Sequence, residues 1–176
     1  MLKLSDSLFN QPVMSLRTGS RVATAVEPII NPHNLKILGW WCQIPQGQRL
    51  VLLAEDVRQA LATGLVIDDE DELAAAEDLA RHKEILDIKF ELIDKPVRTK
   101  RSKLGKISDF SYNDGLFVQK LYVAKPLRKL LVTEDTLIID RTQVLEVTDQ
   151  YILVRDAEVK AKDSELAAAP DALPAI

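Results

Sequence analysis

The chain contains one pattern twice, and this repeat constrains its fold more than any other feature. The stretch FNQPVMSLRTGSRVATAVEPIINP, residues 9–32, resembles LIDKPVRTKRSKLGKISDFSYND, residues 92–114. The match continues through LKILGWWC and LFVQKLYV, and again through LVIDD and ILVRD. A repeat of this length indicates two copies of one structural unit. The aligned positions include Pro12 with Pro96, Ala25 with Ile107, Trp40 with Leu121, Trp41 with Tyr122, and Leu65 with Ile152.

Each copy consists of short apolar runs separated by turn residues, which is the pattern of a small all-β unit. RTGSR and RSKLGK each supply a glycine-containing hairpin turn, and NPHN and NDG supply a second one. The runs between them, such as VQKLYV, TLIID and YILV, are rich in the β-branched and aromatic residues that favour strands. A strand meander exposes its edges unless it closes, so each copy predicts a small barrel of about five or six strands.

The predicted architecture is mainly β, with two small antiparallel β-barrels in tandem joined by an α-helical linker. The first barrel is expected over residues 1–69 and the second over residues 87–158. Residues 70–86 carry an apolar stripe and an acidic start, which predicts the linker helix. PLRKLL, residues 126–131, predicts a short helical turn, and the alanine-rich, charged residues 159–176 predict a flexible tail.

The second copy carries a recognisable set of residues, namely Gly105-Lys106-Ile107, Asp109-Phe110, Asn113-Asp114-Gly115, Asp140 and Val144. This set resembles the PRC-barrel family, which includes the photosynthetic reaction-centre H subunit and the C-terminal domain of a ribosome-maturation factor. The first copy is a weaker match, because Ala23 replaces the glycine and Pro28 stands at the position of Phe110. The resemblance implies a binding or assembly module, and it brings no catalytic motif to this chain.

The reactive residues form no pattern that is typical of an enzyme or a metal site. Cys42 is the single cysteine, so no internal disulfide can form, and its apolar neighbours predict a buried, inert thiol. The two histidines, His33 and His82, do not provide ligands at zinc spacing. We therefore expect no metal, no cofactor and no catalytic residue. An enzyme would need a polar cleft in which one of these histidines lies beside carboxylates.

The sequence also predicts a cytoplasmic location. No segment approaches the roughly 18 consecutive apolar residues that cross a bilayer, so no transmembrane segment is expected. The start, MLKLSDSLFN, lacks the basic residues and the long apolar core of a secretory signal.

The chain has a net charge of −4, but one segment of it is strongly basic. KPVRTKRSKLGK, residues 95–106, contains no acidic residue. On a hairpin, the turn would gather most of this charge at one tip. Such a tip can bind RNA phosphates or an acidic protein, or it can simply keep an edge hairpin soluble. The basic residues are Lys95, Arg98, Lys100, Arg101, Lys103 and Lys106.

Two pairs of aromatic residues are candidates for either core packing or partner contact. Phe110 and Tyr112 share parity on one strand, which favours a common core face over base stacking. Trp40 and Trp41 are adjacent, so they face opposite sides of a strand and at most one is buried inside its own barrel. The outer tryptophan either packs on the second barrel or the linker, or it anchors a partner protein.

Together these features predict a non-enzymatic adaptor or scaffold that binds a protein partner in the cytoplasm. The expected contact residues are the outer member of the pair Trp40 and Trp41 and the basic hairpin over residues 95–106. The alternative is an RNA- or ribosome-associated module that uses the same hairpin. Because the second copy can take the place of a dimer partner, we expect a monomer with an internal pseudo-dimer, and a homodimer is the alternative.

Overall fold

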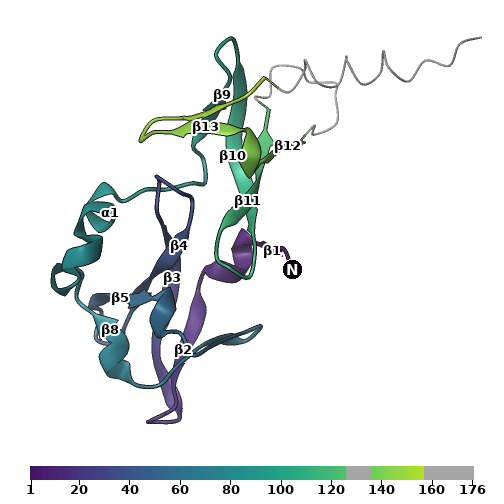
Figure 1. Cartoon of the computed structure of the whole chain (residues 1–176). Coiled ribbons are helices and arrows are strands. Elements are labelled where there is room, and N and C mark those ends of the chain that lie inside the picture. The colour runs from purple at the N-terminus through teal and green to yellow at the C-terminus, as the bar shows by residue number, and fades with distance from the viewer. Residues whose placement is uncertain (126–135, 157–176) are drawn as a thin grey trace, which may run out of the picture.

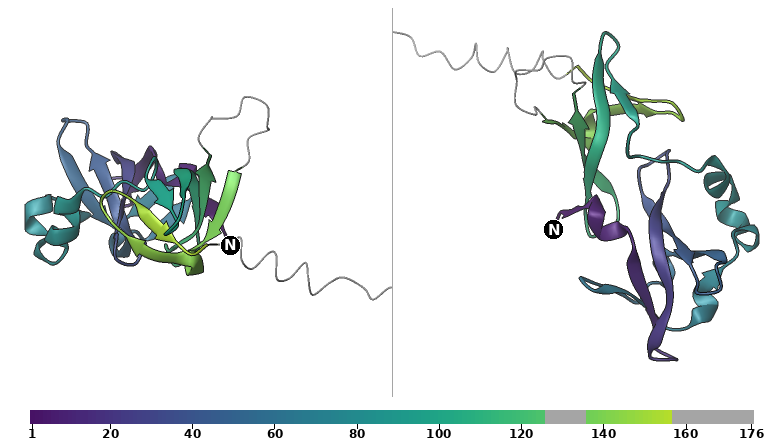
Figure 2. Two further views of the ribbon diagram at one scale, coloured as in Figure 1. Left: turned by 90° about the horizontal axis from the view of Figure 1, so that it is seen from above. Right: turned by 180° about the vertical axis from the view of Figure 1, so that it is seen from behind.

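The computed structural model describes residues 1–125 and 136–156, and within them the chain is mainly β (Figure 1). The strands form two sheets of seven strands each, and each sheet curls into a half-barrel (Figure 2). No pairing within these residues joins the two ends of either sheet. No helix among them has the length and apolar character needed to span a bilayer. The helical turn predicted at 126–131 and the tail predicted at 159–176 lie outside the described residues.

The first sheet has the strand order β6-β7-β2-β3-β4-β5-β8. Its strands are β2 (Gln11–Ser15), β3 (Ser20–Ile30), β4 (Ile37–Gln43), β5 (Arg49–Leu53), β6 (Gln59–Leu61), β7 (Gly64–Ile67) and β8 (Leu73–Ala74). The second sheet has the order β12-β11-β10-β9-β14-β13, and β1 pairs with the end of β10. Its strands are β1 (Lys3–Leu4), β9 (Pro96–Arg98), β10 (Lys103–Tyr112), β11 (Val118–Ala124), β12 (Thr136–Asp140), β13 (Val144–Val147) and β14 (Ile152–Val154).

Short helical elements connect these strands. The α-helix α1 spans Lys83–Ile88 and ends at Lys89, whose positive φ of 48° is the left-handed conformation common at helix ends. The remaining turns are 3-10 helices: η1 (Ser5–Leu8), η2 (Ala54–Asp56), η3 (Glu70–Glu72), η4 (Ala76–Asp78), η5 (Ala80–His82) and η6 (Arg141–Gln143).

The two sheets share one topology, and their strand pairing follows the alignment of the repeat. The order β6-β7-β2-β3-β4-β5 in the first sheet corresponds to β13-β14-β9-β10-β11-β12 in the second. Each order contains one parallel pair at the same place, β2 with β7 and β9 with β14. Trp40 lies opposite Leu52, and the aligned Leu121 lies opposite Ile139. The internal repeat is therefore confirmed at the level of individual strand pairs.

The longest strand of each sheet carries a bulge at the same aligned place. The register of β3 with β4 shifts between Ala25 and Glu27, and the register of β10 with β11 shifts between Ile107 and Asp109. A bulge bends its strand and increases the local twist. Each long strand can thereby pair with one neighbour through its first half and with another through its second half, which curls the sheet.

The segment between the sheets is not the continuous helix that its apolar stripe predicts over residues 70–86. It contains the strand β8, three 3-10 turns and the start of α1. The two residues of β8 pair with the outer edge of β5, because an open strand edge offers hydrogen bonds that compete with helix formation. The stripe still faces the protein: its members Ala76, Leu79, Ile85 and Leu86 pack with Ile29, Val51 and Trp41.

The two sheets meet through equivalent hairpins, the turn between β3 and β4 and the turn between β10 and β11. The amide of Ile37 donates to the carbonyl oxygen of Leu116 at 2.8 Å, and the amide of Val118 donates to the carbonyl oxygen of Leu35 at 3.0 Å. Ile37 is aligned with Val118 and Leu35 with Leu116. The residues between them form an antiparallel bridge. The hairpins therefore pair with pseudo-twofold symmetry, each supplying the same two positions.

The segments that precede the two copies are exchanged between the sheets. β1 pairs with β10 of the second sheet, where the Ser5 hydroxyl donates to Asp109 Oδ1 at 2.5 Å. The segment around α1 instead packs on the first sheet, where Leu86 is buried. Leu8 and Leu92, which precede the aligned prolines by the same distance, are both buried.

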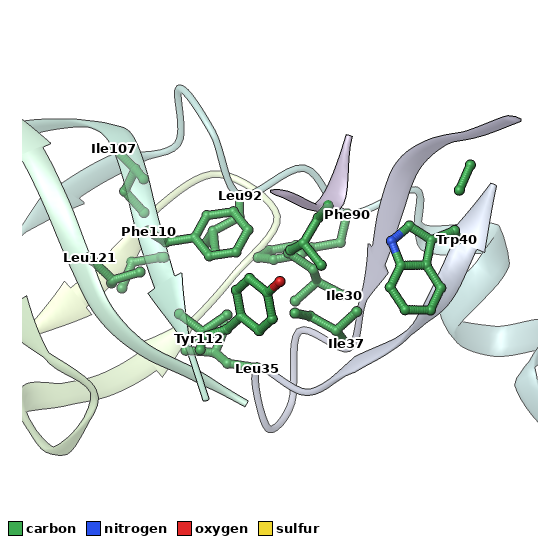
Figure 3. Packing of buried hydrophobic residues seen from close by; sticks show 14 of the residues in the cluster. Ile30, Leu35, Ile37, Trp40, Phe90, Leu92, Ile107, Phe110, Tyr112 and Leu121 are labelled. Carbon is green, nitrogen blue, oxygen red and sulfur yellow. The ribbon is translucent and has the colours of Figure 1, made fainter. Parts of the chain in front are cut away.

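One buried hydrophobic cluster consequently runs through both sheets. Figure 3 shows it at the junction, where Phe110, Tyr112 and Leu92 lie on one side and Ile30 and Ile37 on the other. The two copies thus share a core, because each hairpin and each exchanged segment contributes buried side chains to it.

Candidate functional site

The basic run predicted to form a hairpin lies on β9, on the start of β10 and in the turn between them. Figure 1 shows this hairpin at the end of the second sheet that is farthest from the first sheet. The Thr99 amide donates to the Ser102 carbonyl oxygen at 2.9 Å, which closes the turn. Thr99 Oγ1 also accepts from the Arg101 amide at 3.2 Å. Thr99 is buried, so these hydrogen bonds anchor the turn to the body of the sheet. The side chains of Lys100 and Arg101 are exposed.

Four of the six basic residues gather at this end of the hairpin, and we call Arg98, Lys100, Arg101 and Lys103 the basic tip. All four are exposed. Arg98 lies directly opposite Lys103, so the two cations share one face of the hairpin, a placement that is destabilising by itself. The guanidinium of Arg98 lies 4.0 Å from the centre of the Tyr151 ring. None of the four forms an ion pair with a residue in the described part of the chain.

The other two basic residues lie at the base of the hairpin and not at the tip. Lys95 Nζ donates to the Asp149 carbonyl oxygen at 2.8 Å and lies 4.5 Å from the centre of the Phe90 ring. Burial lowers the pKa of Lys95 below its usual value, an effect that the nearby carboxylates oppose. Lys106 is exposed, but it lies at the far end of the paired region, opposite Pro96. Lys95 is therefore an internal contact of the fold.

The aromatic residues do not accompany the basic tip. Phe110 and Tyr112 are 1% and 5% exposed, which confirms that they share a core face. Phe117 is half-buried, with Arg141 4.8 Å from its ring centre. All nine aromatic residues of the chain lie in the described part, and none of them is exposed.

The two adjacent tryptophans face opposite sides of β4, as expected. Trp40 is 3% exposed and belongs to the shared core. Trp41 is half-buried on the outer face, where it packs with Leu86 of α1. The guanidinium of Arg49 covers it at 4.6 Å from the ring centre and also pairs with Glu27. Both tryptophans are therefore engaged in contacts within the chain.

A cavity of about 570 Å³ lies between the first sheet and the segment that follows α1. Trp41, Phe90 and Leu86 line it, and Glu27 and Arg49 add a charged pair. Neither His33 nor His82 lines it. Within the described residues no three histidine, cysteine, aspartate or glutamate side chains are grouped so that they could hold a metal ion. The lining of the cavity is therefore mixed: apolar and aromatic side chains lie beside the Glu27–Arg49 ion pair and the charged residues Lys89, Glu91 and Asp94.

We expect the thiol of Cys42 to resist alkylation while the protein is folded. Burial raises the pKa of this thiol from 9.0 to about 12. At pH 8 the reactive thiolate should therefore be about a thousandfold scarcer in the folded than in the unfolded chain. The rate of iodoacetamide labelling, measured with and without urea, checks this; equal rates in the two states would contradict it.

The same pKa shift predicts that the free energy of unfolding falls as the pH rises above 9.0, because the Cys42 thiol of the unfolded chain loses its proton before that of the folded chain.

Sequence reasoning missed two features of this region. The pseudo-twofold pairing of the hairpins and the cavity beside Trp41 both depend on how the two copies pack together. The repeat was the available signal for the first, because it placed the two paired hairpins at equivalent positions.

No family model matches the chain, and no curated protein matches it.

Proposed function

We propose that the chain is a non-enzymatic adaptor that docks its basic tip on an acidic surface of a protein partner. The observation that carries this proposal is the basic tip itself, in which four exposed cations gather without a counter-charge in the described part of a chain whose net charge is −4. Like charges at directly opposite positions of a hairpin, such as Arg98 and Lys103, repel one another and destabilise it. An anionic partner would relieve that repulsion.

The adaptor consists, in this proposal, of two PRC-barrel-like units in tandem within one cytoplasmic monomer. The shared topology of the two sheets and the shared bulges support the tandem arrangement. The hairpin pairing supports an internal pseudo-dimer, because each copy occupies the place that a second subunit would take. The resemblance of the second copy to the PRC-barrel family supports a role in assembly and not in catalysis.

A protein partner is favoured over RNA because the tip offers charge without stacking surface. Proteins that bind single-stranded nucleic acid combine a basic groove with aromatic side chains on which bases stack. Tyr151 is the aromatic residue in contact with the tip, and it is half-buried beneath Arg98. Both tryptophans also lie in internal contacts, so the basic tip is the proposed contact surface. The RNA- or ribosome-associated alternative is retained as an outcome of the test.

The experiment compares two charge reversals of equal size. Lys100→Glu with Arg101→Glu alters the tip, and Arg81→Glu with Lys83→Glu makes the same charge change at other exposed positions. Tagged proteins are used to capture partners from lysate with and without nuclease treatment, each at low and high salt. We expect the tip variant to lose a captured protein by at least about tenfold, because a charge-assisted hydrogen bond contributes about 1.5–3 kcal/mol. The control variant should capture it as the native chain does.

Two results would argue against the proposal. Equal capture by the tip variant and the native chain would remove the basic tip from the contact surface. Capture that disappears with nuclease, and that falls steeply between low and high salt, would instead support the RNA- or ribosome-associated alternative.

A further inference from the structure

A second short repeat follows the two copies of the sheet. ELAAAEDL, residues 72–79, follows the first copy, and ELAAAPDAL, residues 165–173, follows the second. The first five residues are identical, and both segments continue through an aspartate to a leucine. Each segment therefore follows the last strand of its own copy, β7 in the first and β14 in the second, with a connection that is six residues longer in the second copy.

The first of these segments completes the edge of the first sheet. Its Leu73 pairs with Leu52 and its Ala74 with Val51, which adds β8 to the open edge of β5. Trp41 lies opposite Val51 on the other side, so the three residues Trp41, Val51 and Ala74 form one row across the outer face. Val51 is fully buried under this segment and α1.

The second sheet presents the same edge without a cover among the described residues. Within residues 1–125 and 136–156, β12 pairs with β11 alone. Tyr122 lies opposite Ile138, in the same way that Trp41 lies opposite Val51. Ile138 is 55% exposed, whereas the equivalent Val51 is 0% exposed. An apolar residue on an unpaired edge strand is a ready template for another strand.

We propose that residues 165–173 of the same chain dock on β12 as an added antiparallel strand. The register of the first sheet places Leu166 opposite Ile139 and Ala167 opposite Ile138. The chain is long enough for this segment to reach β12. Leu73 reaches the equivalent edge six residues after the end of β7, and Leu166 follows the end of β14 by twelve residues. Its sequence also suits the position: LAAA carries no charge, and Pro170 lies beyond the two paired residues, so its missing amide removes no ladder hydrogen bond.

Paired cysteines in the full-length chain test the register directly. In the variant Ile138→Cys with Ala167→Cys, the two thiols would lie directly opposite one another, at a separation that a disulfide can span. The matched control is Ile138→Cys with Ala168→Cys, which moves the second thiol by one residue to the other face of the strand. The native Cys42 is buried and its thiol has a raised pKa, so it does not interfere. Because Ile138 is exposed, its replacement leaves the described core intact.

We expect an intramolecular disulfide that forms about tenfold faster in the opposed pair than in the shifted pair, because docking raises the effective concentration of one thiol at the other. Equal rates in the two variants would overturn the proposal, since they indicate proximity without register. Disulfide-linked dimers formed in place of the intramolecular bond would also overturn it, because β12 would then be covered by a second copy.

Hydrogen exchange of the β12 amides provides an independent readout on the same chain. Docking predicts that these amides exchange at least about tenfold faster in Leu166→Asp, which places a charge at the paired position, than in the native chain. Ile176→Asp, which adds the same charge beyond the segment, should leave the exchange unchanged. Equal exchange in the native chain and Leu166→Asp would contradict docking.

Discussion

Replacing Phe110 with alanine is expected to lower the free energy of unfolding of the whole chain by about 3–5 kcal/mol. Phe110 is 1% exposed and belongs to the cluster that runs through both sheets. Figure 3 shows its ring beside Leu92 and Tyr112 at the junction of the sheets. The substitution removes most of a buried ring and leaves a space that its rigid neighbours cannot fill. Urea unfolding followed by circular dichroism measures the loss.

The matched control for this prediction is Leu145→Ala in β13 of the same sheet. Leu145 is 46% exposed, so removing its side chain should change the free energy of unfolding by about 0.5 kcal/mol or less. A loss below about 1 kcal/mol for Phe110→Ala would place this ring outside the well-packed core.

Gly105→Ala is expected to destabilise the chain by about 3 kcal/mol through backbone strain and steric conflict together. Gly105 has a φ of +150°, which side-chain-bearing residues rarely adopt. A Cβ at this position would also press against the backbone carbonyl oxygen of Ala124 in β11. The neighbouring strand cannot retreat without breaking its pairing with β10. Thermal or urea unfolding measures the effect.

Gly115→Ala provides the comparison for this substitution. Gly115 lies in the turn between β10 and β11, its φ is not positive, and a Cβ there would come no closer than 3.4 Å to Asn113 Oδ1. We therefore expect a change within about 0.5 kcal/mol. Similar losses for the two variants would show that Gly105 is not under a special constraint. The first copy has Ala23 at the aligned position, and its φ is not positive, which explains why alanine is accepted there.

Much of the fold could be predicted because the repeat and the turn residues are local signals. Two copies of the same apolar runs and turns are expected to form the same strands, and in the structure the aligned Trp40 and Leu121 do occupy equivalent places in the strand pairing. The same reasoning placed Phe110 and Tyr112 on a core face and Trp40 and Trp41 on opposite faces. Alternation of side chains along a strand needs no knowledge of the tertiary fold.

The linker could not be predicted correctly because its conformation depends on a distant strand. Residues 70–86 have a helical stripe, but Leu73 and Ala74 find hydrogen-bond partners on the edge of β5. Tertiary pairing therefore overrides local helix propensity there. The ELAAA segment illustrates the difficulty. Its residues do not by themselves indicate a strand, and only the pairing of β8 on the first sheet shows that the first copy of the segment forms one.

The position of the basic hairpin could be predicted from the sequence, but which of the candidate residues are exposed on it depends on tertiary packing. The hairpin and the exposure of its tip follow from the basic run and its turn. The internal role of Lys95 does not, because it depends on where Phe90 and Asp149 lie. Trp41 packs with Leu86 of the linker, which is one of the two alternatives that the adjacent tryptophans suggested, whereas its contact with Arg49 could not be read from them.

The most direct test of the central claim, that two copies of one unit share a single core, is the unfolding of Phe110→Ala followed by two signals. Both tryptophans lie on β4 of the first sheet, whereas Phe110 lies on β10 of the second. If the core is shared, tryptophan emission and circular dichroism should give one coincident transition, and the substitution should shift both midpoints equally. A tryptophan transition that keeps its native midpoint, while circular dichroism separates into two steps, would contradict the claim.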